Sequence, residues 1–241
     1  MVQNLEINSS QIDKIKKITE EEKNFRIKNL ELFKASGFPN KRLEDWKFTD
    51  FKYIVDSNFE ELDVKKVSSD INKIDLLKDF EHNYILLVNG NLQSSNFNYE
   101  EKSKIKIKTY DKSINYQLSK NPLICLNHAL AENGYSLEID KNYKFKKVLV
   151  IYNFFTKDIK NKILNNKNKI KISENAELHV IEYTINESKS KFINNVYENI
   201  VLKKNAKLKN LYIQNNTSDG FFHKFLKNEL SFQSDYSNLI F

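Results

Sequence analysis

One short unit recurs along the second half of the chain at a nearly constant spacing, and this periodicity constrains the fold more than any other feature. Each copy has the order apolar, variable, apolar, polar, polar, and then Asn or Asp. Successive copies are shifted by 33, 30 and 30 residues. The copies span residues 137–144, 170–177, 200–207 and, with a weaker match, 230–237.

The unit predicts a strand, a corner formed by Asn or Asp, and a second strand, because short Asx side chains bond the local backbone and tolerate the bend. A unit of this size cannot bury its apolar face alone, whereas stacked copies share one continuous core. Parallel strands stacked in this way form a β-solenoid. The competing interpretation is a β-sandwich or a meander, but tight hairpin signals are scarce after Asn89-Gly90.

The first part of the chain has the apolar spacing of helices rather than strands. Ser10, followed by Asp13, fits a helix start with a capping box. Apolar residues then recur at roughly helical spacing until Gly37 and Pro39, which end the pattern. We therefore expect one long amphipathic helix, or two helices in line, over residues 10–36.

The next segment, GFPNKRLEDWKFTDF, covers residues 37–51 and contains the only Trp and one of the two Arg of the chain. Trp46, Phe48 and Phe51 supply a large apolar area. We expect them to anchor the helices on the domain that follows. The two carboxylates of the segment are adjacent in sequence and would point in different directions on a helix, which disfavours a role as an acid–base pair.

A polar connector follows, with a short helix expected near residues 70–80 behind a possible cap at Ser68-Ser69-Asp70. Residues 84–92 then have the pattern of a buried strand that runs into an Asn89-Gly90 turn. From this point the chain is rich in strand patterns.

The patterns together predict an α+β protein with two regions. Residues 1–80 would form an N-terminal helical region and connector, and residues 81–241 a partial parallel β-helix. The formal net charge of +7 would suit a nucleic-acid partner. However, Arg26 and Arg42 are the only Arg among 39 basic residues, and Arg is the residue that binds bases and phosphates bidentately. We therefore expect no nucleic-acid partner.

The single cysteine and the lack of an apolar leader or of a long apolar run favour a cytoplasmic protein without membrane contact. Shifted by the repeat, His179 maps to Lys209 and Leu239, and His223 maps to Ile193, so no column of metal ligands forms. We assign no catalytic, cofactor-binding or metal-binding residue. The residues for which a buried, structural or solvent role is expected are Cys125, His82, His128, His179 and His223.

Residues 37–51 closely resemble the N-terminal signature of the SufD family, approximately G-x-P-x-x-R-x-E-x-W-K-Y-T-D. Two later segments resemble the family in the same order: 87–90 is similar to its V-N-G segment, and 126–134 to its L-N-x-A-x-x-x-x-G segment. The resemblance covers most of residues 20–241. The matching signature positions are Gly37, Pro39, Arg42, Glu44, Trp46, Lys47, Thr49 and Asp50, with Phe48 where the family usually has Tyr.

This resemblance implies an N-terminal helical region, a right-handed parallel β-helix, and a C-terminal helical segment. It also implies a non-catalytic scaffold subunit for iron–sulfur cluster assembly, which pairs with SufB through the β-helix in a complex driven by the SufC ATPase. Iron–sulfur clusters usually need several thiolates, and Cys125 is the only one here. No cofactor is therefore expected on this chain alone, and any cluster would be shared with SufB.

The sequence departs from the family pattern in its length. Family members are longer, and the late β-helix, the interface His, the C-terminal helices and the SufC-docking segment have no counterpart in this sequence. We therefore transfer no functional residue from the family. We expect the sequence to be part of a longer protein, because it stops inside an apolar unit; a shortened paralogue is the alternative.

Other hypotheses belong to different classes. A carbohydrate-binding or carbohydrate-active solenoid predicts clustered carboxylates and exposed aromatic residues along one face, whereas the repeats offer Lys, Asn and Glu without paired acids. A basic nucleic-acid-binding module predicts salt-dependent binding to DNA. Among scaffold subunits for iron–sulfur cluster assembly, a SufB-like subunit is disfavoured by the E-D-W-K signature.

Overall fold

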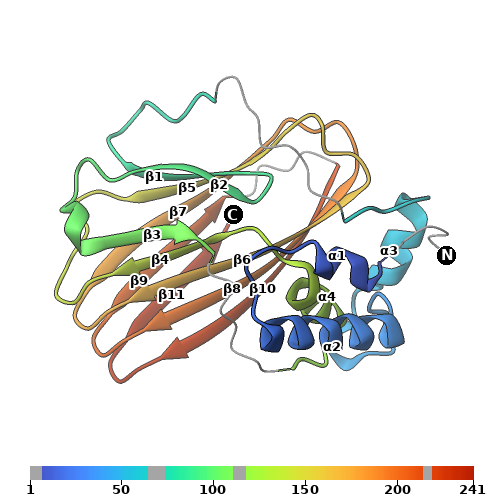
Figure 1. Cartoon of the computed structure of the whole chain (residues 1–241). Coiled ribbons are helices and arrows are strands. Elements are labelled where there is room, and N and C mark those ends of the chain that lie inside the picture. The colour runs from blue at the N-terminus through green and yellow to red at the C-terminus, as the bar shows by residue number, and fades with distance from the viewer. Residues whose placement is uncertain (1–6, 65–73, 111–117, 214–218) are drawn as a thin grey trace.

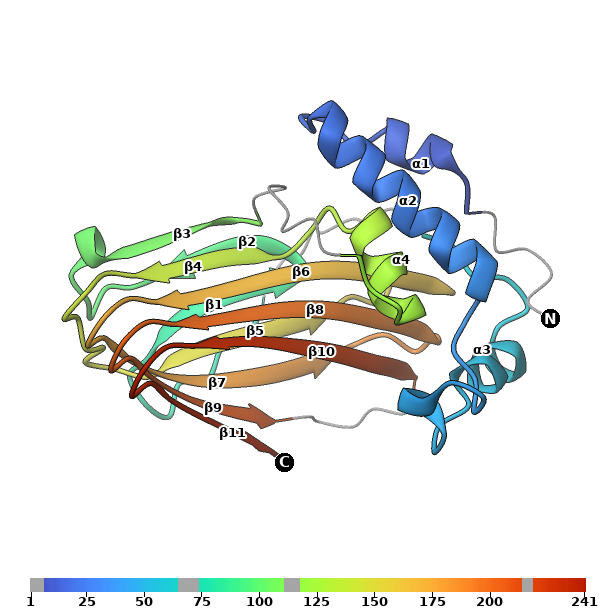
Figure 2. The ribbon, with the colours of Figure 1, turned by 90° about the horizontal axis from the view of Figure 1, so that it is seen from below.

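Long strands stacked side by side form most of the molecule, and the longer helices gather beside one end of them (Figures 1 and 2). The computed structural model describes residues 7–64, 74–110, 118–213 and 219–241. The helical elements are α1 (Ser9–Asp13), α2 (Glu20–Ser36), the 3-10 turn η1 (Glu44–Trp46), α3 (Phe51–Asn58), the 3-10 turn η2 (Lys102–Lys104) and α4 (Pro122–Leu130). The strands are β1 (Asn83–Val88), β2 (Asn91–Asn96), β3 (Ile105–Thr109), β4 (Tyr135–Ile139), β5 (Leu149–Phe155), β6 (Lys162–Ile172), β7 (Glu177–Asn186), β8 (Phe192–Leu202), β9 (Lys207–Ile213), β10 (Gly220–Leu230) and β11 (Asp235–Ile240).

From β4 onward the chain alternates between two sheets, as a solenoid requires. One sheet has the order β11-β9-β7-β5-β1-β2 and the other has the order β10-β8-β6-β4-β3. The strands that carry the repeat pair in parallel with their neighbours. Only β1 with β2 and β3 with β4, before the repeat becomes regular, are antiparallel among the described pairs. The predicted α+β fold with a parallel β-solenoid is confirmed, and the sandwich is excluded.

The predicted register of the repeat is correct for the first two steps and wrong for the third. Leu137 pairs with Ile170, and Ile170 pairs with Ile200, which are the expected shifts of 33 and 30. Leu230 pairs with Leu202 rather than with Ile200, so the last step is two residues shorter than expected. Alternation along a strand has a period of two, and a slip of two residues therefore leaves every side chain on its predicted face.

Asparagines at the corners form a column along one end of the solenoid, as the repeat predicted. Asn142, Asn175 and Asn205 have left-handed φ angles of 60°, 58° and 56°. The Asn175 side-chain amide donates to Asn142 Oδ1 at 2.8 Å, and the Asn205 amide donates to Asn175 Oδ1 at 2.8 Å. In the last coil the left-handed residue is Gln233, with φ 56°, and not Asp235 as the sequence alignment suggested.

The Asn89-Gly90 turn between β1 and β2 is the predicted tight hairpin. Both residues have positive φ, 51° and 82°, which is the signature of a type I′ turn. Gly90 is required for a second reason, because a Cβ at this position would lie 2.0 Å from Asn166 Oδ1 on β6. Any other residue at this position would therefore require the Asn166 side chain to move away from the hairpin.

The segment predicted to be helical over residues 10–36 forms two helices, one of the two alternatives expected, and its first cap differs from the prediction. Asn8, not Ser10, caps α1, and its side chain pairs reciprocally with Gln11. Helix α1 ends at Asp13, the link that follows includes Lys17 with a left-handed φ of 58°, and α2 begins with Thr19 as its cap. Gly37 ends α2 with φ 67°, as expected. Within the described ranges, no helix combines the length and the apolarity that crossing a bilayer would need.

The signature segment joins the helices to the solenoid, but only two of its three aromatic residues do so. Phe51 is buried in the core below the helices, and the Trp46 ring lies 5.7 Å from it. Trp46 also contacts the ring of His223 on β10, at 5.5 Å between centroids. Phe48, which we expected to add to the anchor, is 88% exposed. It follows Trp46 after a single turn and lies on the opposite, solvent-facing side.

Other parts of the prediction near the connector are changed or fall outside the described residues. Residues 74–80 contain no helix, and the possible cap at Ser68-Ser69-Asp70 lies outside the described residues. Helix α4, which belongs to the second predicted region, packs against α2 and against β6 and β8. The helical layer is therefore built from both predicted regions of the sequence.

Candidate functional site

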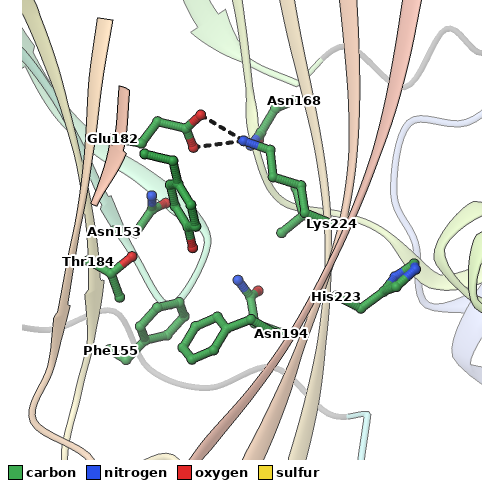
Figure 3. A pocket seen from close by; sticks show the side chains of 11 residues that line it. Asn153, Phe155, Asn168, Glu182, Thr184, Asn194, His223 and Lys224 are labelled. Atoms are coloured by element: carbon green, nitrogen blue, oxygen red, sulfur yellow. Dashed lines mark hydrogen bonds and ion pairs between the residues drawn. The ribbon is translucent and has the colours of Figure 1, made fainter. Parts of the chain in front are cut away.

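The middle of the solenoid interior is polar, although both of its ends are apolar. Toward the Asn corners, aliphatic side chains such as Leu137, Ile170 and Leu202 fill the interior. Near the helices, the rings of Phe155 and Phe192 close it. Polar side chains from both sheets surround a cavity of about 30 Å³ between these ends. They are Asn153, Asn168, Glu182, Thr184, Asn194 and Lys224 (Figure 3).

Lys224 on β10 is the centre of this polar region. Its Nζ lies 2.7 and 2.8 Å from the two carboxylate oxygens of Glu182 on β7, and 2.6 Å from Oε2 of Glu198 on β8. Figure 3 shows Glu182 and Lys224 extending toward one another from opposite sheets. The ammonium group therefore connects the two sheets across the interior of the solenoid.

Strand alternation explains why these three charges face inward. Glu182 follows Val180 at a distance of two along β7, and Val180 belongs to the apolar interior. In the same way, Glu198 precedes the interior residue Ile200 on β8. Alternate residues of a strand share one face, so a Glu cannot point outward unless the apolar residues on the same face also do. The buried charges must therefore be neutralised where they lie.

Burial and mutual attraction act in opposite directions on this cluster. Glu198 is completely buried and Glu182 is 5% exposed. Burial raises the pKa of Glu198 by disfavouring the carboxylate; attraction to Lys224 opposes this shift, and repulsion from Glu182 adds to it. Burial alone would lower the pKa of Lys224, but its two carboxylate partners outweigh burial and raise the pKa. Lys224 is therefore held in its charged form.

A chain of polar groups extends from this cluster through neighbouring coils. The Tyr135 hydroxyl on β4 donates to Glu198 Oε1 at 3.3 Å. The Asn210 amide on β9 donates to Glu182 Oε1 at 2.7 Å and to Asn238 Oδ1 on β11 at 3.1 Å. Together with Lys224, these groups link strands from the first coil of the repeat to the last.

The geometry suits a structural role better than catalysis. Both carboxylates already accept hydrogen bonds from protein groups, and a catalytic acid or base must reach a substrate directly or through one water. A polar cavity of about 30 Å³ has room for roughly one or two water molecules. Across the described ranges, no group of three or more His, Cys, Asp and Glu side chains is placed to hold a metal ion.

Two acidic residues come together although they do not stack in register. The repeats were expected to offer Glu without a paired-acid register, and Glu182 and Glu198 lie on different sheets, yet they bind the same ammonium group. The sequence carried a signal for this, because each Glu lies two residues from an aliphatic core residue, Val180 or Ile200, and therefore on the inward face of its strand. Neither their meeting nor their common partner Lys224 could be found from the sequence, because the three residues lie on three different strands.

The cysteine and two of the histidines occupy structural positions, as expected. Cys125 is buried in α4, its Sγ lies 3.1 Å from the Ser119 carbonyl oxygen, and burial raises the pKa of its thiol to about 11. His82 contacts the Tyr152 hydroxyl at 2.8 Å. His128 was expected in a polar context, but it is buried in the helical layer with only 5% exposure.

The two histidines of the repeat region have partly different neighbours from those predicted. His179 is exposed and pairs in register with Lys209, as expected. On the next coil, however, Lys209 pairs with Ser237 rather than with Leu239. His223 pairs with Asn195 and not with Ile193, for the same reason of a two-residue slip. Its Nδ1 lies 2.8 Å from Asn195 Oδ1. Figure 3 shows its ring pointing away from the interior, toward the helices.

A scan of the sequence against protein-family models finds no match, and a search of curated proteins finds none either. Any family assignment therefore depends on the motifs of the sequence, and we treat it as a proposal.

Proposed function

We propose that this chain is a non-catalytic scaffold subunit for iron–sulfur cluster assembly, similar to SufD. In this proposal it pairs with a SufB-like protein through the solenoid, in a cytoplasmic complex driven by a SufC-like ATPase. The observation that carries the proposal is the signature at residues 37–51, followed in family order by segments 87–90 and 126–134. The arrangement of helices followed by a parallel solenoid is compatible with it.

The last strands of the two sheets supply a surface that suits such pairing. β10 and β11 end the strand orders of their sheets, so one backbone edge of each has no neighbouring strand among the described residues. Leu230, Leu239, Ile240 and Phe241 along this edge are between 53% and 75% exposed. Unpaired edges with apolar side chains favour association with further β-structure. Further β-structure, whether a continuation of the solenoid or a SufB-like solenoid, would bind at this edge.

The interior of the solenoid supports a scaffold rather than an enzyme. Its paired carboxylates, Glu182 and Glu198, are buried and held by Lys224, and do not line an outer face that a sugar chain could reach. The hypothesis of a carbohydrate-active solenoid therefore gains no support from these acids. In the proposed complex an iron–sulfur cluster would be shared with the partner, because the only cysteine, Cys125, is buried.

Co-purification with a SufB-like and a SufC-like protein tests the proposal. The chain should retain the SufB-like protein and fail to retain the SufC-like ATPase in the absence of the SufB-like protein, because the family's docking segment has no counterpart here. A double substitution, Leu239→Lys with Ile240→Lys, should weaken the pairing by at least about tenfold, since it places charges on the apolar edge.

The matched control is Leu32→Lys, which changes a residue that is 40% exposed on α2, away from the edge. It should leave the pairing unchanged. Strong binding of the SufC-like protein by this chain alone, or equal binding of the SufB-like protein by both variants, would contradict the proposal. Salt-dependent binding to DNA in place of either protein would support the nucleic-acid hypothesis.

A further inference from the structure

Two basic side chains are buried between the helices and the solenoid, and each has a buried nitrogen with no hydrogen-bond partner among the described residues. Helix α2 packs on α4, and α4 in turn packs on β6 and β8. Lys167 on β6 is 1% exposed, and its Nζ has no hydrogen-bond partner among the described residues. His128 on α4 is 5% exposed, and its Nδ1 likewise has none. We call this layer, defined by Glu22, Arg26, His128 and Lys167, the helix–solenoid seam.

The one carboxylate of the seam is already occupied by a third basic group. Glu22 Oε1 accepts from Arg26 Nε at 3.0 Å and lies 2.9 Å from Arg26 Nη2. Arg26 Nη1 also donates to the Ala129 carbonyl oxygen at the end of α4, at 3.0 Å. Arg26 therefore joins α2 to α4, and it uses the negative charge that Lys167 would need.

Among the described residues, the other groups that act on the two bases add no further negative charge. The His128 ring lies between Phe25 of α2, at 5.7 Å, and Tyr197 of β8, at 4.8 Å. The charges that act on His128 are those of Lys167, Arg26 and, from β10, Lys227. Those that act on Lys167 are Arg26 and Glu22. A proton on either base would thus add positive charge to a dry layer that already holds a cation.

Burial and positive neighbours affect the two bases in the same direction. Burial, then repulsion by Arg26, lowers the pKa of Lys167 well below its usual value, with only partial compensation from Glu22. Burial, then repulsion by Lys167, Arg26 and Lys227, lowers the pKa of His128 to about 2. Burial thus disfavours a proton on each base while the seam is closed, whereas in water each would take up a proton at its ordinary pKa.

We propose that the helix–solenoid seam is a proton-sensitive latch, which holds α2 and α4 against β6 only while Lys167 and His128 are unprotonated. When the helices separate from the sheet, water reaches both side chains, and each can bind a proton. Lowering the pH therefore favours the open form over the closed form. This inference concerns the chain's own conformation and does not depend on the proposed function.

Linkage gives the size of the effect. Lys167 is protonated in water throughout the neutral range, so each unit decrease in pH should raise the ratio of open to closed molecules by up to about tenfold, at pH values above the pKa of Lys167 in the closed form. Below about pH 6.5, protonation of His128 in the open form should add about another tenfold per unit. The solenoid core has no part in this local opening.

Hydrogen exchange of the full chain between pH 5.5 and 8.5, corrected for the intrinsic rates, measures the opening. The expected result is that amides of α2 and α4 open up to about tenfold more for each unit decrease in pH, and that at every pH they open more often than amides of β5 and β7. Lys167→Met should remove the dependence above about pH 6.5. His128→Phe, which keeps a ring between Phe25 and Tyr197, should remove only the additional dependence below it.

Three results would overturn the proposal. One is opening of α2 and α4 that does not change with pH in the natural chain, and another is an unchanged slope in Lys167→Met. The third is opening of β5 and β7 together with the helices, because this would report global unfolding. If Lys167→Met does not fold, Lys167→Gln, which keeps a polar neutral side chain of similar length, must show the same loss of pH dependence.

Discussion

Lys224 and Lys167 lie on two strands of the same sheet, β10 and β6, and their side-chain nitrogens are withdrawn from solvent on opposite faces of it. The charges around the two nitrogens differ. Lys224 points into the interior and meets two carboxylates, at 2.6 to 2.8 Å. Lys167 points outward under the helices and has no partner among the described residues, while the nearby Glu22 is bound by Arg26. The pKa of Lys224 is raised above its usual value and that of Lys167 is lowered.

This comparison shows that burial alone does not decide what a lysine does in a fold. A buried charge with good partners roughly balances its desolvation, and removing one partner then leaves an uncompensated charge. A buried amine without a partner gives up its proton, and the fold bears that cost at every pH below the ordinary pKa. Lys224 should therefore stabilise its surroundings in the charged state, and Lys167 should destabilise its own.

The largest effect is expected from Lys224→Met, which removes the only cation between two buried carboxylates. We expect a loss of about 3–5 kcal/mol in the free energy of unfolding at pH 7, because Glu182 and Glu198 would repel each other in a medium of low polarity. Urea denaturation, followed by circular dichroism, measures it.

The matched control is the triple variant Glu182→Gln, Glu198→Gln and Lys224→Met, which removes all three charges. It should recover most of the lost stability, since buried ion pairs are often replaceable by neutral groups of similar volume. A loss below about 1 kcal/mol in the single variant would mean that water reaches the cluster and that the pairing contributes little.

Lys167→Met should have the opposite effect and raise the free energy of unfolding, by on the order of 3 kcal/mol at pH 7. The pKa of Lys167 is lowered in the folded state, so folding below the unfolded-state value of about 10.4 requires the loss of a proton. The penalty grows as the pH falls from that value toward the folded-state pKa, and the gain from Met should therefore shrink as the pH rises toward 10. Thermal unfolding from pH 6 to 10 checks both the sign and the trend.

Trp46→Ala should lower the free energy of unfolding by about 2 kcal/mol. Trp46 is only half-buried, and its ring contacts Phe51 and, on the outward side of β10, His223. A fully buried ring would cost about 3–5 kcal/mol. The exposed neighbour Phe48 provides the control, because Phe48→Ala should change the stability by less than about 0.5 kcal/mol. Equal effects of the two substitutions would show that Trp46 is not an anchor.

The solenoid itself was predictable because its signals are local. Alternation of apolar residues marks each strand, and Asn at a left-handed corner marks each turn, so Asn142, Asn175 and Asn205 were found from a few residues each. The final step of the repeat was misplaced because Leu230 and Ile200 share a face, and alternation cannot distinguish a shift of 28 from one of 30.

The two lysine environments were not predictable because they depend on which strands and helices meet. Glu182, Glu198 and Lys224 lie on separate strands, and their meeting depends on how two sheets face each other. Lys167 is surrounded by α2 and α4, which come from distant parts of the chain. The one available signal was a charge at an inward position of a strand, and it identifies single residues rather than their partners.

The column of corner asparagines has a consequence for how coils of unequal length can be stacked. Each coil is aligned with the next at the corner, so a difference in coil length must be absorbed elsewhere along the path. Between the last two coils the pairing of β9 keeps a spacing of 30 with β7, whereas that of β10 with β8 is 28, and the difference therefore falls in the connection from β9 to β10. Residues can thus be gained or lost in the connection from β9 to β10 without disturbing the stack of corner asparagines, which keeps neighbouring coils in step even though they differ in length.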